Sequence, residues 1–430
     1  MNNNKIFKIR IIGAGLYGCL LAFHLKSKFK KKISIELIEN SNDVISNYKS
    51  IKLSDVRLNN GFHGIEYPRA KSLIKFLKND LKFNLIKSYN KRLLCIENHL
   101  IDYTYSKFKW PSKLKKNFYF KNKITIEKKD IEKFISKDYL QFLKKIGKRY
   151  SNNFEEINHH FIPWFFPSNL KVKSNDEGDD FRNKVRDNKL TPYFFFPKSG
   201  VFEDLQKYFK NYLIRLGVKI HFNSSIHFND NDYYVLKNGK IDKSFKKVEH
   251  TFFTASTPLL LKNFESKITS DLLKEKKYLV NKIVRVNCQL DKKFSEIIFA
   301  NSFLPNLLRA SITPNIASNK NSKYLQIEML FKDDKIDIYD KKLIEILSKI
   351  LNIKTTSIKI EDSKITRTLF FPKNFHKKKA IKYLDLRLKN FKNFSHRNIF
   401  GPPNMSKAWI NSYIDANNLY NKLYKNEKPR

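Results

Sequence analysis

Residues 6–40 constrain the fold of this chain more than any other stretch. They read IFKIRIIGAGLYGCLLAFHLKSKFKKKISIELIEN, in which an apolar, strand-like run (6–12) meets the glycine turn GAGLYG. A helical pattern follows through Leu25, and a second strand-like run covers residues 33–38. The order strand, turn, helix, strand predicts a βαβ unit at the start of a parallel sheet.

The glycine spacing in this unit is typical of dinucleotide-binding turns. Gly13 allows the tight turn, Gly15 lets the backbone approach a pyrophosphate, and Gly18 lets the helix pack closely on the strand. Backbone amides at the helix start, at Leu16 and Tyr17, carry partial positive charge toward the phosphates. The turn therefore predicts a phosphate-binding site.

Glu39 completes this motif. It ends the second strand about twenty residues after Gly18, where a carboxylate accepts hydrogen bonds from ribose hydroxyls and repels a 2′-phosphate. The unit therefore predicts a dinucleotide with an unphosphorylated ribose, which fits NAD and FAD equally. A lipoprotein signal is the weaker interpretation, because Arg10 leaves too short an apolar core.

Composition bounds the class of protein. With 430 residues, 41% hydrophobic, the chain can bury large cores in more than one domain. No run of 18 apolar residues occurs, so we expect no transmembrane helix. The three cysteines (Cys19, Cys95 and Cys288) are scattered, which predicts a reducing, cytoplasmic setting and neither a disulfide framework nor a metal site.

The formal net charge of +44 raises a rival class, the nucleic-acid or anionic-membrane binders. The lysines of this chain are spread along its whole length without a basic block or recognisable motif. We therefore expect no specific nucleic-acid partner. Attraction for anionic small molecules and peripheral contact with an acidic membrane surface are consistent with the field of such a chain.

Residues 56–69, VRLNNGFHGIEYPR, are dense in groups that do chemistry. Two glycines among His63, Tyr67 and Arg69 predict backbone packed against a flat ligand, with polar side chains directed at it. A plain turn before a helix is the alternative, and the two interpretations are compatible.

Four units in a fixed order resemble a known family. They are the glycine turn with Glu39, the Gly-x-His element at Gly61, residues 195–226 (FFPKSGVFEDLQKYFKNYLIRLGVKIHFNSSI) and residues 252–258 (FFTASTP). This order resembles the FAD-dependent amine oxidases and their relatives, the protoporphyrinogen oxidases and UDP-galactopyranose mutases. The resemblance implies an α/β fold: a Rossmann-type FAD-binding domain with an interleaved α+β substrate domain that contains a mostly antiparallel sheet.

The resemblance also implies domain boundaries and site residues. Residues 1–75, 193–262 and 392–430 would form the FAD-binding domain, and residues 76–192 and 263–391 the substrate domain. His63 would lie near the flavin, where its titration range suits proton transfer, with Tyr67 and Arg69 as further catalytic candidates; a packed histidine is the alternative. The implied cofactor-binding residues are Gly13, Gly15, Leu16, Tyr17, Gly18, Glu39, Asn59, Gly61, Ile226, Ala255 and Gly401.

Three arginines on strand-like segments, Arg285, Arg309 and Arg367, are candidates for binding an anionic substrate, because a guanidinium offers a bidentate fork. Each fits an exposed strand residue equally well. Two departures from the family pattern stand out: Pro402 occupies the place of an acidic residue, and no Gly-Gly-Arg occurs between residues 40 and 54.

The leading functional hypothesis is an FAD-dependent oxidoreductase. Residues 59–69 look like those of FAD oxidoreductases associated with surface-glycan synthesis, which suggests a glycan or nucleotide-sugar precursor as substrate. The alternatives are a flavin-dependent mutase like UDP-galactopyranose mutase and a flavoprotein scaffold without catalysis. The electron acceptor, the mode of FAD attachment and the oligomeric state stay open at this point.

Overall fold

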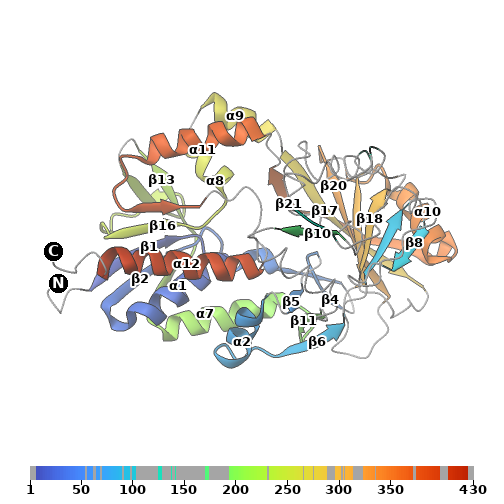
Figure 1. Cartoon of the computed structure of the whole chain (residues 1–430), viewed down its shortest axis with the longest axis horizontal. Coiled ribbons are helices and arrows are strands. Elements are labelled where there is room, and N and C mark those ends of the chain that lie inside the picture. The colour runs from blue at the N-terminus through green and yellow to red at the C-terminus, as the bar shows by residue number, and fades with distance from the viewer. Residues whose placement is uncertain are drawn as a thin grey trace.

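The fold is known from a computed structural model. It describes residues 6–53, 56–61, 64–67, 70–89, 92–96, 99–102, 124–127, 137, 141, 170–173, 193–229, 232–264, 266–274, 276–287, 296–301, 304, 306–312, 323–334, 336–370, 374–397 and 405–424. These residues form two layered bodies, each built around one large sheet (Figure 1).

A five-stranded parallel sheet organises the first body. Its order is β12-β2-β1-β16-β22, and every neighbouring pair is parallel. Both faces are covered, which explains the nearly continuous apolar runs of its central strands. The strands are β1 (Phe7–Ile12), β2 (Ile33–Ile38), β12 (Val218–His221), β16 (His250–Phe253) and β22 (Phe394–His396).

Four helices share the hydrophobic core on one face of this sheet, with α1 packed along α12 (Figure 1). Helix α2 shows why: its apolar residues recur at helical spacing, so Leu73, Ile74 and Leu77 are buried together while its lysines face water. The helices are α1 (Leu16–Phe29), α2 (Lys71–Asn79), α7 (Leu205–Arg215) and α12 (Met405–Tyr424).

The opposite face carries a small antiparallel sheet and three helices, which share a second core with Ile12 and Ile38. Asn238 and Gly239 both have positive φ, 50° and 78°, which confirms the hairpin turn that the Asn-Gly pair predicts. The elements are β13 (Ser224–Phe228), β14 (Tyr233–Lys237), β15 (Lys240–Ile241), α8 (Thr257–Leu261), α9 (Lys267–Lys274) and α11 (Asn374–Leu388).

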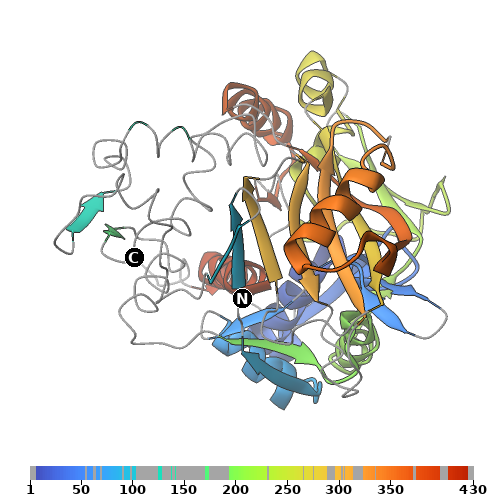
Figure 2. The same cartoon turned by 90° about the vertical axis from the view of Figure 1, so that its right-hand side faces the viewer.

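The second body is a seven-stranded sheet with one face covered by α10 (Asp340–Leu351) (Figure 2). Only its β18–β7 pair is parallel, so the sheet is mostly antiparallel, and the predicted fold class is confirmed. In spatial order its strands are β21 (Ile358–Phe370), β17 (Lys276–Val286), β20 (Tyr324–Phe331), β19 (Leu307–Ile312), β18 (Glu296–Asn301), β7 (Arg92–Ile96) and β8 (His99–Asp102).

The face of this sheet opposite α10 meets short strands of the first body. Leu58 and Ile51 pack against Ile283 and Tyr324, and the side-chain amide of Gln326 donates to the backbone oxygen of Asn59. The short strands are β3 (Ser50–Lys52), β4 (Arg57–Asn59), β5 (Ile65–Tyr67), β6 (Leu85–Tyr89) and β11 (Tyr193–Pro197), and a separate pair consists of β9 (Ile124–Glu127) and β10 (Leu170–Lys173).

All strands of the parallel sheet come from the segments predicted to form the FAD-binding domain, and all strands of the seven-stranded sheet come from the other segments. The exact domain boundaries stay a prediction. Among the described helices, none is long and apolar enough to cross a membrane.

Candidate cofactor site

The glycine turn joins β1 to α1 at the carboxyl edge of the parallel sheet. Gly13 has φ 104° and donates its N–H to the carbonyl of Ile38 at 2.8 Å. Helix α1 begins at Leu16, and its first intrahelical bond runs from Cys19 N–H to Gly15 at 3.0 Å. The N–H groups of the helix's first turn therefore have no intrahelical acceptor and can receive an anion.

The three glycines differ in what surrounds them. A Cβ on Gly18 would lie 1.9 Å from the carbonyl oxygen of Gly13, so helix and turn are in direct contact. A Cβ on Gly13 would approach the hydroxyl of Thr254 at 3.0 Å. A Cβ on Gly15 would meet nothing within 4 Å, so space is open beside the helix start. The turn is thus closed behind Gly18 and open at Gly15, as a backbone cradle for a diphosphate requires.

Glu39 is fixed at the mouth of this turn. Its carboxylate accepts hydrogen bonds from the backbone N–H of Ala14 at 2.7 Å and of Ser41 at 2.9 Å. The side chain is half-buried, and each carboxylate oxygen keeps acceptor capacity beyond one bond. The position and charge of Glu39 therefore suit hydrogen bonds from the hydroxyls of an unphosphorylated ribose.

Thr254, directly after β16, supports the turn from the neighbouring strand. Its hydroxyl lies within hydrogen-bond distance of two acceptors, the carbonyls of Ile12 at 2.9 Å and Gly13 at 2.8 Å. The next residue, Ala255, has its N–H 3.4 Å from where a Cβ of Gly13 would stand, so this predicted cofactor residue adjoins the turn. Sequence reasoning missed Thr254, and its signal was a hydroxyl at the end of a buried strand.

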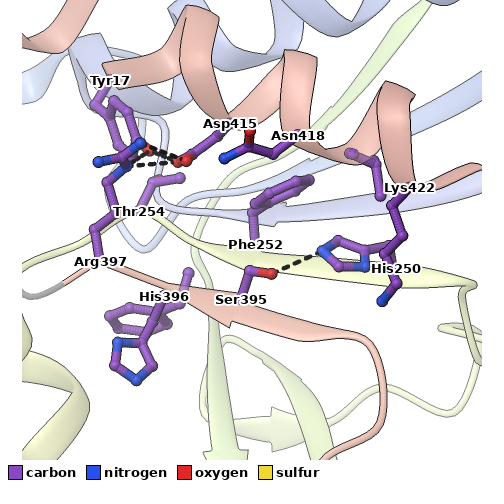
Figure 3. Close-up of a pocket in the computed structure, with 12 residues that line it drawn as sticks. Tyr17, His250, Phe252, Thr254, Ser395, His396, Arg397, Asp415, Asn418 and Lys422 are labelled. Carbon is purple, nitrogen blue, oxygen red and sulfur yellow. Dashed lines mark hydrogen bonds and ion pairs between the residues drawn. The ribbon is translucent and has the colours of Figure 1, made fainter. Parts of the chain in front are cut away.

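Tyr17 joins the helix start to the C-terminal helix. Its hydroxyl donates to the carboxylate of Asp415 on α12 and accepts from Nε of Arg397 at 3.0 Å (Figure 3). Arg397 also pairs with Asp415, Nε to Oδ2 at 2.8 Å and Nη2 to Oδ1 at 2.5 Å. Burial, with Asp415 adding to it, raises the pKa of Tyr17 well above its usual range, so the hydroxyl stays protonated.

This network closes one end of a cavity of about 240 Å³ that lies beneath α12, over β16 and β22 (Figure 3). At the other end, His250 contacts the hydroxyl of Ser395 at 3.0 Å, and Lys422 lines the wall. Burial lowers the pKa of His250 to about 4, with a smaller effect of Lys422 in the same direction, so this imidazole is neutral at pH 7.

The second predicted part of the site, around Gly61, lies where the two bodies meet. Gly61 has φ 97°, and a Cβ there would stand 2.9 Å from the carboxylate of Glu328 on β20. Asn59 is buried and acts as a bridge, because its amide donates to the carbonyl of Gly200 at 2.9 Å and accepts from Phe202 N–H at 2.7 Å. The Gly61 segment is therefore held from both bodies.

The predicted catalytic residues are described only in part. Tyr67 lies on β5, where its ring stacks on Tyr193 with centroids 4.6 Å apart. His63, Arg69 and Gly401 lie outside the described residues, so their roles stay predictions.

The three predicted substrate arginines are not brought together. Arg309 forms a bidentate ion pair with Glu328, with N–O distances of 2.7 and 2.8 Å. Arg285 is exposed on β17. It lies four residues along this strand from Asn281, and Asn281 is the residue paired with Glu328 on β20. Arg367 lies on β21, the edge strand beyond β17.

Ile226, predicted to bind the cofactor, is buried on β13 in the core that also contains Ile12 and Ile38. Its side chain packs in that core, and any cofactor contact would fall to its backbone.

Residues 11–79, which contain the glycine turn, α1 and β2, match a family described as an NAD(P)-binding Rossmann-like domain. No curated protein matches the chain. Among solved structures, a putative protoporphyrinogen oxidase from Exiguobacterium sp. 255-15 superposes with a TM-score of 0.64 at 8% identity, covering 97% of this chain and 99% of that one. A reduced UDP-galactopyranose mutase gives 0.64 at 12% identity, covering 97% and 96%.

A redesigned putrescine oxidase superposes with a TM-score of 0.55 at 12% identity, covering 97% of this chain and 99% of that one. These likenesses extend over nearly the whole chain. The chain therefore shares its fold with these two oxidases and this mutase, which confirms at the level of the fold the resemblance carried by its motifs.

Proposed function

We propose that this protein is an FAD-dependent oxidoreductase acting on a small molecule. The observation that carries the proposal is the glycine turn open at Gly15, with the carboxylate of Glu39 fixed at its mouth by two backbone amides. Such a turn suits a diphosphate beside an unphosphorylated ribose, as FAD provides. A bound flavin would supply the redox chemistry, while the protein would position substrate and tune the ring.

The second body supports FAD over NAD as the cofactor. Gln326 and Glu328 of its sheet contact the Asn59–Gly61 segment, which the family resemblance assigns to the flavin end of FAD. In this proposal Gly61 and Gly401 approach the flavin. His63 would hydrogen-bond a bound flavin or transfer a proton, and Tyr67 and Arg69 would assist it.

The substrate in this proposal is a glycan or nucleotide-sugar precursor bound against the seven-stranded sheet. The Arg309–Glu328 ion pair supports it, because substrate phosphate or hydroxyl groups could exchange for one partner of this pair on the sheet face. Arg285 and Arg367 would act at the edges of such a site.

The absorption spectrum of the purified protein is the first test. We expect the bands of oxidised flavin and their loss on adding dithionite. FAD at one hundred times its Kd should stabilise the flavin-free protein by about 2.7 kcal/mol. A protein that is colourless and takes up no FAD would contradict the proposal.

Glu39→Ala tests whether the glycine turn is the binding site. It removes the ribose acceptor and the hydrogen bond from the Ala14 N–H of the turn, so we expect FAD affinity to fall at least tenfold. Glu249→Ala is the control, because Glu249 also accepts a backbone N–H, that of Lys8 at 2.8 Å, at the opposite end of β1. Equal FAD affinity in both variants would place the cofactor elsewhere.

Nucleotide-sugar turnover by the loaded protein would then separate oxidation from isomerisation. Product with altered oxidation state supports the oxidoreductase. Interconversion of sugar rings that occurs only with reduced flavin would show that the protein is a mutase and not an oxidoreductase. Flavin binding without any turnover would favour a scaffold.

A further inference from the structure

Arg397 stands at the edge of the parallel sheet where dinucleotides bind. It directly follows β22, and the pairing of Phe253 with His396 places it level with Thr254, which supports the Gly13 turn. Carboxyl ends of parallel strands form the ligand-binding edge of such sheets. No pattern in the sequence distinguishes Arg397.

Its guanidinium is held rigidly by neighbours on one side. Nε and Nη2 make the bidentate pair with Asp415, Nε also donates to Tyr17, and Nη2 also donates to the carbonyl of Asn411 at 3.3 Å. Within the described part of the chain, Nη1 has no acceptor, and the side chain is 30% exposed. One edge of the fork therefore remains available to a ligand.

The glycine turn itself brings no positively charged side chain to a diphosphate. No lysine or arginine occurs between Gly13 and Phe23, so a diphosphate at this turn would meet only amides and the helix dipole there. Arg397 is joined to the second residue of that helix through the Tyr17 hydroxyl (Figure 3). The fold thereby connects the guanidinium of Arg397 to this turn.

We propose that Arg397 is a cofactor-binding residue whose Nη1 donates to the diphosphate of the dinucleotide. Asp415 and Tyr17 are positioning residues, which orient the guanidinium before the ligand arrives and so reduce the entropy lost on binding. The inference rests on the proposed function, because it needs a dinucleotide at the glycine turn. Its ligand group is a phosphate and not the flavin ring.

A purely structural network would behave differently. If the Tyr17, Arg397 and Asp415 contacts only tied α1 to α12, their loss would lower the free energy of unfolding and leave the Kd of FAD and the Kd of ADP nearly unchanged. A contact to the diphosphate instead predicts equal losses for FAD and for ADP, which share the adenosine and phosphates but not the flavin.

The experiment measures the Kd of FAD for the flavin-free protein by flavin fluorescence, and the Kd of ADP by competition. Arg397→Met keeps the apolar stem and removes the fork, and we expect both ligands to bind tenfold to a hundredfold more weakly. Lys422→Met is the matched control, because Lys422 lines the same cavity at its far end, and it should change neither Kd more than twofold.

Three outcomes would overturn the inference. If Arg397→Met binds FAD and ADP with wild-type affinity, Arg397 does not contact the diphosphate. If only FAD binds more weakly, Arg397 acts at the flavin end of the cofactor. Wild-type protein that binds neither ligand removes the proposed function as well. If Arg397→Met does not fold, Tyr17→Phe and Asp415→Asn replace it: each should weaken ADP at least threefold, and unchanged ADP affinity in both would overturn the inference.

Discussion

Gly13 and Gly18 are in contact across the first turn of the chain: a Cβ on Gly18 would stand 1.9 Å from the carbonyl oxygen of Gly13. Gly15, between them, would place a Cβ in open space. The two outer glycines therefore serve the fold, whereas the middle glycine keeps room for a ligand.

The pair Gly18→Ala and Gly15→Ala separates these two roles. Gly18→Ala drives a methyl into backbone, so we expect a loss of more than about 3 kcal/mol, beyond the usual range for overpacking. Gly15 has φ −62° and ψ 175°, which alanine adopts freely, and its loss as the N-cap of α1 opposes the smaller entropy of the unfolded variant, so stability should stay within about 1 kcal/mol of wild type. Urea unfolding measures both.

The same pair predicts the reverse order for the cofactor. Gly15→Ala should bind FAD at least tenfold more weakly while remaining folded, because its methyl fills the space that a diphosphate would use. Unaltered FAD binding by a folded Gly15→Ala protein would show that the ligand does not approach this turn.

Asn59 is predicted to stabilise the fold through its side-chain hydrogen bonds to Gly200 and Phe202. Asn59→Ala leaves the buried carbonyl of Gly200 and N–H of Phe202 without their side-chain partner, and should cost about 3 kcal/mol of unfolding free energy. Ser199→Ala, in the same turn but exposed, is the control and should stay within about 0.5 kcal/mol. Chemical denaturation decides, and equal midpoints would contradict the bridging role.

Arg309 and Glu328 are predicted to be coupled. Arg309→Met leaves the carboxylate of Glu328, which is 9% exposed, without its ion pair, and should cost about 2–3 kcal/mol after allowance for the partly exposed arginine. The double variant Arg309→Met, Glu328→Met should recover most of that loss. A double-mutant cycle in urea measures the coupling, and simple additivity would refute it.

Two buried histidines should make the protein sensitive to acid. Burial lowers the pKa of His24 and, together with a smaller contribution from Lys422, that of His250 from 6.5 to about 4. Between these values the unfolded chain binds protons that the folded protein does not, so stability is full above pH 6.5 and falls as pH drops toward 4. Each histidine contributes up to about 3 kcal/mol to this loss.

The variant His24→Phe tests this pH dependence. His24 lies among the rings of Phe23, Trp409 and Tyr413, where phenylalanine fits and does not titrate. The free energy of unfolding, measured at pH values of about 7, 6 and 5, should fall less steeply with decreasing pH in the variant, because one of the two histidines that take up a proton only on unfolding is absent. Parallel pH profiles for variant and wild type would contradict the assignment.

The sequence by itself determined the βαβ unit, the dinucleotide turn and the acid at its mouth. The strand at Ile33–Ile38 and the turn at Asn238 and Gly239 appear where the residues predict them. These features are local: hydrophobic periodicity, glycine spacing and turn chemistry act over a few residues, so a single sequence carries them. The family order of the motifs added the fold of the second body.

Only the tertiary structure decided which distant side chains meet. Thr254 reaches Gly13 from 241 positions away, and Tyr17 reaches Asp415 from 398. Arg309, predicted to await an anionic substrate, is already paired with Glu328 on the next strand. Such partners depend on which strands become neighbours and in what register, and this is set by the packing of whole layers and not by any local pattern.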